Sequence, residues 1–197
     1  MILAAGASER LGEPKLLARI GPRTVLEHLL EASLAAEPPL VVTGRHHAPI
    51  AEFVERLEAP VVLVHNAAWE AGRTGSVGAA VEHDPGRALL IAPCDVPLVP
   101  RCVFQALIEA WSIAGAPPQG WLAPLAPDRE GTSRPGHPIV LGSALAERIR
   151  TSPADRPLRE LRREARPLWT VDVESVAIHD DLDTAADLNA LRARFLT

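Results

Sequence analysis

The first hundred residues alternate between short apolar runs and longer amphipathic stretches. The apolar runs have the length of buried strands and lie at 2–5, 39–44, 61–65 and 88–92. The amphipathic stretches repeat their apolar positions at helical spacing, and we place helices at 24–36, at 50–57, from Ser76 onward and at 102–113. Strands that alternate with helices predict an α/β fold, in which a mostly parallel, twisted sheet is covered by helices on both faces in three layers.

The regular alternation stops after residue 113. Three further strands are expected at 121–125, 139–141 and 168–173, the last half-exposed, with a polar loop at 127–138 and helices at 143–150, 158–165 and 185–195. Two capping boxes, Thr24 with Glu27 and Thr184 with Asp187, predict the starts of the first and last helices. We find no linker or internal repeat, so the sequence predicts one domain over 1–197.

Composition limits the class of protein. A chain of 197 residues with 47% hydrophobic content can bury one core, and its net charge of -5 disfavours a nucleic-acid partner. No apolar run reaches the length of about 18 residues that a membrane helix needs, so we expect no membrane association and a cytoplasmic location. Cys94 and Cys102 fit a reducing compartment. Because Met1 directly precedes the first apolar run, we expect the true start to lie upstream.

The first apolar run leads into a glycine-containing basic loop. Gly6 and Gly12 allow positive φ or a close approach of the backbone, so that main-chain N–H groups can face an anion, while Arg10 and Lys15 supply charge. Lys15 is the single lysine among the 20 basic residues, which indicates a need for a compact ammonium there, although chance placement is the alternative. The spacing matches neither the Walker A loop nor the dinucleotide fingerprint. The loop therefore predicts a phosphate site of another kind.

An aspartate follows the most evenly apolar run. Asp95 comes after 88–92, at the edge of the expected phosphate crevice, where an unpaired carboxylate is unfavourable and a hard cation stabilises it. Mg²⁺ held by one or two carboxylates and by substrate phosphates fits this position, and a structural turn aspartate is the alternative. Cys94 beside it is interpreted as a packed small residue.

The opening loop resembles the L-A-A-G-x-S-x-R-[ML]-G-x-P-K-L-L signature of nucleotidyltransferases, in particular those that attach a nucleotide to the molybdenum cofactor. The resemblance implies their Rossmann-like nucleotidyltransferase fold. It also implies that Arg10 and Lys15 contact the phosphates, that Asp95 holds magnesium, and that the base and ribose contact Leu3, Ala4, Ala5 and Gly6.

Three later elements extend the resemblance. Residues 66–77 resemble the W-x-x-G-x-x-x-S element of molybdenum cofactor cytidylyltransferases, which implies that Ser76 contacts the base and Arg73 a phosphate; an N-cap serine and a surface arginine are the alternatives. The family's D-x-D-T-P-x-D-L element is matched with Ala185 in place of proline, and implies Asp183 as a second metal carboxylate. The G-H-P element implies that His137 contacts the acceptor phosphate, unless it caps its loop.

The implied reaction moves CMP from CTP to the phosphate of molybdopterin, with residues 1–100 binding the nucleotide and 101–197 the acceptor. A molybdoenzyme is a further partner that the resemblance suggests. Three alternatives stay open: a guanylyltransferase of the same family, whose loop favours Leu-Ala-Gly-Gly where this chain has Leu-Ala-Ala-Gly; a cytidylyltransferase for a sugar or polyol phosphate; and a non-catalytic carrier of the cofactor.

Overall fold

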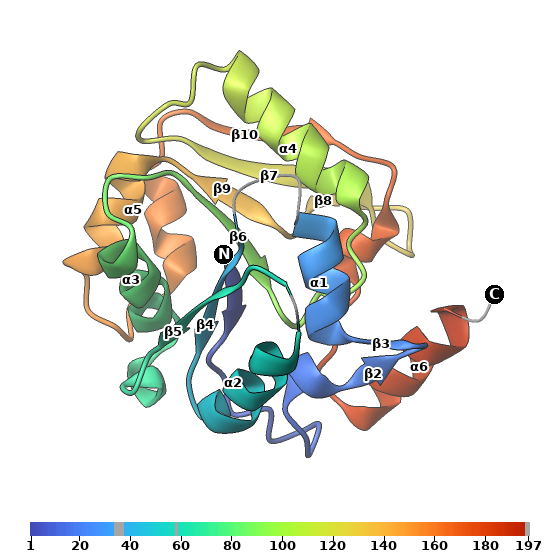
Figure 1. Ribbon diagram of the computed structural model, residues 1–197. Coiled ribbons are helices and arrows are strands. Elements are labelled where there is room, and N and C mark those ends of the chain that lie inside the picture. The colour runs from blue at the N-terminus through green and yellow to red at the C-terminus, as the bar shows by residue number, and fades with distance from the viewer. Residues whose placement is uncertain (34–37, 58, 196–197) are drawn as a thin grey trace.

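The computed structural model describes residues 1–33, 38–57 and 59–195 (Figure 1). The strands that form its main sheet are β1 (Ile2–Ala4), β4 (Leu40–Thr43), β5 (Val62–His65), β6 (Leu89–Pro93), β7 (Trp121–Pro127), β8 (Ser133–Pro135), β9 (Ile139–Leu141) and β10 (Leu168–Asp172). Within the described residues their order is β10-β7-β9-β6-β1-β4-β5, and β8 pairs with β7. Strands β6, β1, β4 and β5 are parallel, as are β7 and β10, whereas β9 runs antiparallel to β6 and β7. The predicted α/β fold with a mostly parallel sheet is confirmed.

Helices cover both faces of this sheet. They are α1 (Val25–Ser33), α2 (His47–Arg56), α3 (Arg73–His83), α4 (Arg101–Ile113), α5 (Ser143–Arg150) and α6 (Ala185–Phe195). The part of the chain that the structure describes also contains short 3-10 helices: η1 (Lys15–Leu17), η2 (Trp69–Ala71), η3 (Leu158–Arg163) and η4 (Val176–His179). In Figure 1, α3 and α5 lie together on one side of the sheet, and α1 and α4 pack on the other.

Successive strand residues enter different cores. In β1, Ile2 packs in the core that includes α1 and α4, whereas Leu3 packs in the core that includes α3 and α5. The pair Val41 and Val42 in β4 divides in the same way. Side chains alternate between the faces of a strand, so an uninterrupted apolar run fits a strand that is buried on both sides. For this reason continuous apolar runs located the central strands, rather than stretches in which apolar and polar residues alternate.

Both predicted capping boxes form. Thr24 N donates to Glu27 Oε2 at 2.7 Å and Glu27 N to Thr24 Oγ1 at 3.2 Å. Thr184 N donates to Asp187 Oδ2 at 2.8 Å and Asp187 N to Thr184 Oγ1 at 3.2 Å. Each box satisfies N–H groups at the start of its helix that otherwise have no intrahelical partner.

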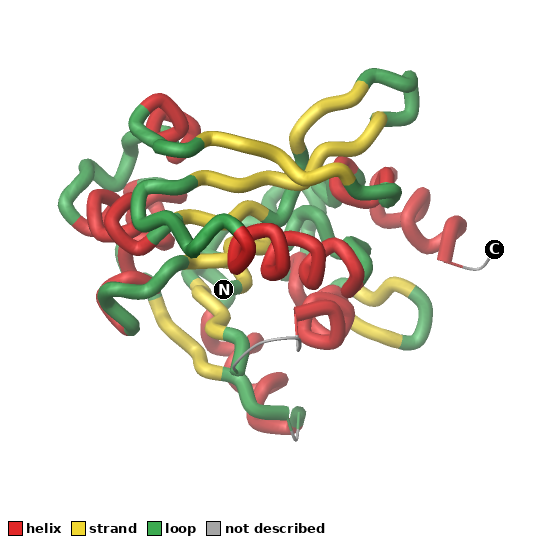
Figure 2. Tube along the Cα trace, turned by 90° about the horizontal axis from the view of Figure 1, so that it is seen from above, coloured by secondary structure: helices red, strands yellow, loops and turns green. Residues whose placement is uncertain are grey.

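Several expected elements differ in the structure. The polar loop expected at 127–138 contains β8, which forms a hairpin with β7 that projects from the body of the molecule (Figure 2). The helix expected at 158–165 is the shorter 3-10 helix η3. A second hairpin, β2 (Arg19–Ile20) with β3 (Arg23–Thr24), was not expected. Residues 34–36 of the first expected helix lie outside the described residues.

Among the residues that the structure describes, no helix combines the length and the hydropathy that spanning a membrane requires.

Candidate active site

The carboxyl ends of β1 and β6 form one wall of a pocket. The strands are parallel neighbours with Leu3 beside Pro93, and Cys94 N donates a hydrogen bond to Leu3 O at 3.1 Å. Both segments therefore leave the sheet at the edge where ligands bind in open α/β sheets. The pocket is lined by Leu3, Ala5, Gly6, Ser8, Lys15, Trp69, Arg73, Ser76, Pro93, Cys94 and Asp95.

Most of the residues predicted from the sequence meet at this pocket. Seven line it: Leu3, Ala5, Gly6, Lys15, Arg73, Ser76 and Asp95. Arg10 lies in an adjoining depression with Lys15 and Asp183. The side chain of Ala4 packs in the core instead, and His137 lines a neighbouring cavity. The lone lysine and the aspartate after β6 therefore face one space, while their chemical roles stay predictions.

The loop after β1 is folded by backbone contacts around Ser8. Ser8 has a φ of 54°, and its carbonyl accepts hydrogen bonds from Leu11 N and Gly12 N, both at 3.1 Å. Gly12 has a positive φ (81°), which is one of the two uses that the sequence predicts for the loop glycines. Gly6 does not have a positive φ, which leaves the close approach of the backbone as its predicted use. A Cβ at Gly6 would meet nothing within 4 Å, so a ligand can approach its backbone freely. Ser8 Oγ also accepts from Lys15 N at 3.3 Å, which ties the loop to η1.

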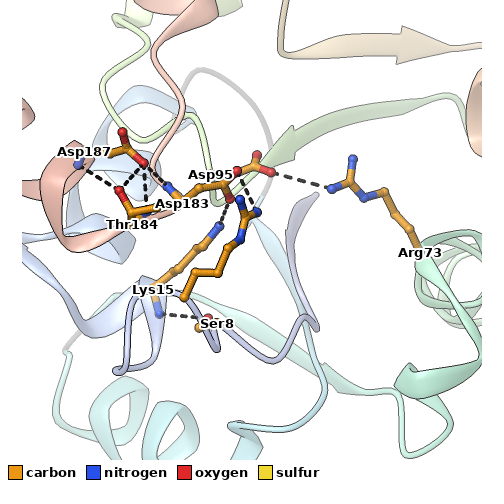
Figure 3. Close-up of polar contacts among 8 residues, drawn as sticks. Ser8, Lys15, Arg73, Asp95, Asp183, Thr184 and Asp187 are labelled. Carbon is orange, nitrogen blue, oxygen red and sulfur yellow. Dashed lines mark hydrogen bonds and ion pairs between the residues drawn. The ribbon is translucent and has the colours of Figure 1, made fainter.

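Lys15 and Arg10 share one carboxylate. Lys15 Nζ lies 2.7 Å from Asp183 Oδ1 (Figure 3). Arg10 Nη2 lies 2.8 Å from Asp183 Oδ2. The Lys15 hydrogen bond, followed by the charges of Lys15 and Arg10, lowers the pKa of Asp183. The Lys15 side chain is 13% exposed, so its ammonium is held in place before any phosphate arrives. This contact joins residues 168 positions apart, and the sequence did not predict it.

Carboxylates gather next to that pair. Leu182 N donates to the carbonyl oxygen of Asp95 at 2.6 Å, which fixes the segment before α6 against the end of β6. Loss of water contact and then the carboxylates of Asp95 and Asp183 raise the pKa of Asp181. The sequence prediction missed Asp181, although it is the first aspartate of the D-x-D element that supplied Asp183. Three acidic residues thus lie close together, and Asp183 and Asp95 each have a basic partner.

The acidic groups fit a divalent cation that completes its ligand set with substrate. Among residues 1–33, 38–57 and 59–195, no set of three His, Cys, Asp or Glu side chains is arranged to enclose a metal ion. Asp95 nonetheless lines the pocket, and its Oδ2 forms an ion pair with Arg73 Nη2 at 3.6 Å. Mg²⁺ commonly takes one or two protein carboxylates, several waters and substrate phosphates, which this arrangement allows. The metal role of Asp183 stays a prediction, and a metal would have to share that carboxylate with two cations.

Helix α3 begins earlier than expected. It starts at Arg73, after Gly72 (φ 135°, ψ 166°), so Ser76 lies in the first turn and is not an N-cap. Ser76 is buried, and its Oγ accepts a hydrogen bond from Asn66 Nδ2 at 2.9 Å. The Arg73 side chain leaves the start of the helix and reaches Asp95 across the pocket (Figure 3). The sequence located this segment correctly but misplaced the helix boundary by three residues.

Cys94 lines the pocket beside Asp95 without nucleophilic character. Burial, and then the charge of Asp95, raise the pKa of its thiol to about 12, so the thiol stays protonated at neutral pH. This agrees with the interpretation of Cys94 as a packed small residue.

Comparison with known proteins places the chain in a family. Residues 1–168 match the MobA-like NTP transferase domain. A relative from Bacillus cereus strain Q1, named "Probable molybdenum cofactor guanylyltransferase", is 34% identical over 113 residues, which are 57% of this chain and 56% of that protein. The chain thus matches about half the length of the curated relatives.

Solved structures share the fold at low identity. A nucleotidyl transferase from Methanothermobacter superposes with a TM-score of 0.77 at 21% identity, covering 99% of this chain and 95% of that one. Rv0371c from Mycobacterium tuberculosis superposes with a TM-score of 0.75 at 22% identity, covering 98% and 96%, and its complex with manganese has also been solved. The family match and the shared architecture lead to one conclusion: the chain belongs to the MobA-like NTP transferase domain family of nucleotidyltransferases.

Proposed function

We propose that the protein transfers a nucleoside monophosphate from a nucleoside triphosphate to the phosphate of a molybdopterin-type acceptor, with release of pyrophosphate. The observation that carries this proposal is the convergence of Lys15 and Asp95 on one pocket at the carboxyl ends of β1 and β6. A triphosphate needs both features, because cations must bind its oxygens and a carboxylate must hold its metal. The relatives' names supply the acceptor.

The reaction needs little covalent chemistry from the protein. An acceptor phosphate oxygen attacks the α-phosphorus in line, a new P–O bond forms, and the bond to the β-phosphate oxygen breaks so that pyrophosphate leaves with its electron pair. The attacking oxygen is already anionic, so no general base is required. When bound at Asp95, a divalent cation such as Mg²⁺ supplies charge neutralisation to the phosphate oxygens.

Lys15 and Arg10 act by position and charge. In the proposal the Lys15 ammonium exchanges part of its contact with Asp183 for a contact with the reacting phosphate, where negative charge increases in the transition state. Arg10, whose side chain is 69% exposed, binds the outer phosphates from the rim. Arg73 lies between the pocket and the neighbouring cavity, so it can contact phosphate groups of both substrates. Residues 1–100 would then hold the nucleotide, and 101–197 the acceptor.

For the base we propose cytosine, because Ala5 lines the pocket where the guanylyltransferase loop favours glycine. In this proposal the additional methyl group leaves less room for a purine and favours the smaller pyrimidine. Guanine is the second candidate, and the names of the curated relatives favour it.

The test is incubation of the purified protein with molybdopterin, Mg²⁺ and either CTP or GTP, followed by mass analysis. We expect an acceptor whose mass has increased by one CMP unit, together with released pyrophosphate. An acceptor that has gained a GMP unit would show that the base is guanine and not cytosine, and would still support the proposed transfer reaction. No adduct with either nucleotide, from protein that binds both substrates, would contradict the proposed reaction and favour a carrier. Replacing molybdopterin by a sugar phosphate serves as the acceptor control.

A further inference from the structure

A second cavity lies beside the nucleotide pocket and shares the Arg73 wall with it. It has a volume of about 450 Å³ and lies between the start of α3, strand β9 and the segment that contains η3. Thr74 Oγ1 donates to the carbonyl of Arg156, and Gly75 N donates to Ala154 O at 3.4 Å, so the segment before η3 is fixed against α3. The cavity is therefore a built feature of the fold, and it borders the nucleotide pocket at Arg73.

The arginines on its wall are not equivalent. Arg156 Nη2 lies 2.5 Å from Glu164 Oε1 and its Nε lies 3.4 Å from Glu160 Oε2, so this guanidinium is neutralised within its own segment. Arg159 and Arg162 line the same cavity, and within the described residues neither forms an ion pair with an acidic side chain. Asp155 is the acidic residue on this wall. Arg73 at the edge of the cavity is paired with Asp95. The charges of Arg159 and Arg162 outweigh that of Asp155, so the cavity keeps a positive potential that attracts an anion.

Apolar and aromatic side chains also line the cavity. Trp121 and Ile139 are buried, and Leu158 is half-buried against them. The Arg162 guanidinium lies over the Trp121 ring, with its carbon 5.9 Å from the ring centroid. A planar guanidinium held over an aromatic ring presents a flat, cationic surface on which another conjugated ring can stack.

His137 adds a ring nitrogen that can form a hydrogen bond with a ligand. Its Nδ1 is buried and has no hydrogen-bond partner among the described residues. Burial is the largest effect on its ring and lowers its pKa, so the imidazole is neutral at pH 7 and can exchange a hydrogen bond with a ligand nitrogen or oxygen. A buried polar atom without a partner is unfavourable, and a bound ligand would satisfy it.

We propose that this cavity binds the acceptor, that it takes a planar nitrogen heterocycle carrying a phosphate ester, and that Arg159 and Arg162 select its negative charge. This assignment rests on the proposed nucleotidyl transfer and extends it to residues outside the motifs. The heterocycle lies against Trp121 and Arg162, and the phosphate lies at the Arg73 end, next to the nucleotide pocket. Arg159 contributes to acceptor affinity and takes no part in nucleotide binding.

The chain offers a matched pair of variants. Arg159→Glu reverses a charge on the cavity wall, whereas Arg163→Glu reverses an exposed charge in the same 3-10 helix that does not line the cavity. Binding of hydroxymethylpterin phosphate is measured by its fluorescence at several salt concentrations. Hydroxymethylpterin, which has no phosphate, and glycerol phosphate, which has no ring, serve as ligand controls. Nucleotide binding and thermal melting are measured on the same protein samples.

For Arg159→Glu we expect the dissociation constant of the pterin phosphate to rise about tenfold or more at low salt, because reversal replaces an attraction by a repulsion. The dissociation constant of the pterin phosphate should also depend less on salt concentration than in wild type. The nucleotide affinity and the melting temperature of the variant should stay within error of wild type. Arg163→Glu should resemble wild type, and both control ligands should bind weakly.

Equal losses of pterin phosphate affinity in the two variants, or no loss in either, would overturn the cavity assignment. Binding as tight for the control ligands as for the pterin phosphate would overturn the proposed ligand class. This test can fail independently of the proposed reaction. If binding of the pterin phosphate depends on Arg159 but no nucleotide adduct forms, the proposed reaction alone is refuted. If the adduct forms and Arg159→Glu has the wild-type KM for the acceptor, the assignment of the acceptor to this cavity alone is refuted.

Discussion

Replacement of Lys15 by methionine separates two roles of its ammonium, which are stabilisation of the fold and stabilisation of the transition state. In the folded protein Lys15 Nζ donates to Asp183 Oδ1 at 2.7 Å, and in the proposed reaction it neutralises phosphate charge. Lys15→Met keeps the length of the aliphatic stem and removes the charge. The variant should therefore fold, lose a small part of its stability, and lose most of its activity.

The structure sets the size of each effect. A hydrogen bond to a charged group contributes about 1.5–3 kcal/mol. The Asp183 side chain is 34% exposed and keeps Arg10 at 2.8 Å, and screening by solvent reduces the expected loss to about 1 kcal/mol. Removing one preorganised group that stabilises transition-state charge lowers kcat by about 10²–10³. Activity should thus fall far more than stability does.

The pH dependence of the stability loss follows from Asp183. Its pKa is lowered in the folded state, chiefly by the Lys15 hydrogen bond. A carboxyl whose folded pKa is lowered stabilises the fold above its unfolded pKa, and that contribution is lost as pH falls through the folded value. The difference in unfolding free energy between wild type and Lys15→Met should be constant from about pH 5 to pH 8 and shrink below about pH 4.

Urea unfolding across this pH range and initial rates of pyrophosphate release measure the two effects. Lys15→Arg is the control: it keeps the charge and should retain more stability, but its planar fork should not restore turnover. Wild-type turnover by folded Lys15→Met would remove this residue from the mechanism. A stability difference that persists unchanged at pH 3 would show that the Asp183 pair is not its source.

Three further variants test other parts of the account. Asp95→Asn should lower kcat by about 10²–10³ and change the melting temperature of the free protein little. Nucleotide should no longer stabilise this variant more strongly when a divalent cation is present. Stabilisation that still depends on the cation would contradict metal binding at Asp95. Gly72→Ala should lower the free energy of unfolding in urea by about 1–3 kcal/mol or more, because Gly72 has a φ of 135° and an added Cβ would lie 2.4 Å from Ala154 O. Gly86→Ala is the control and should lower the free energy of unfolding less, because the space around its Cβ is open. Equal losses would refute the packing argument. Ala5→Gly should shift the CTP to GTP ratio of kcat/KM toward GTP by about tenfold, and an unchanged ratio would remove Ala5 from base selection.

The sequence predicted the parts of the fold that are set by local pattern. Apolar runs located β1, β4 and β6 because these strands are buried on both faces, and capping boxes located the starts of α1 and α6. The same reasoning placed Asp95 at a strand end. The parallel arrangement of β1 and β6 then brought this residue to the pocket that Lys15 lines.

The parts that the sequence did not predict depend on contacts between distant segments. Strand β8 is exposed and consists of Ser133, Arg134 and Pro135, so it has no apolar alternation, and its pairing with β7 defines it. The Lys15–Asp183 pair joins opposite ends of the chain and has no local signature. Helix α3 begins at Arg73 because Gly72 takes a conformation that other residues avoid and packs against Ala154, a contact that the local sequence does not contain.

The central claim is that Lys15 and Asp95 bind one triphosphate and its cation between them. A crystal structure of the protein with a CTP analogue that cannot be cleaved between its α- and β-phosphates, in the presence of Mn²⁺, tests this claim most directly. We predict anomalous density for the cation at the Asp95 carboxylate, with Lys15 Nζ within hydrogen-bond distance of a phosphate oxygen that the same cation contacts. A nucleotide bound away from the pocket between β1 and β6, or a cation bound without Asp95, would contradict the account.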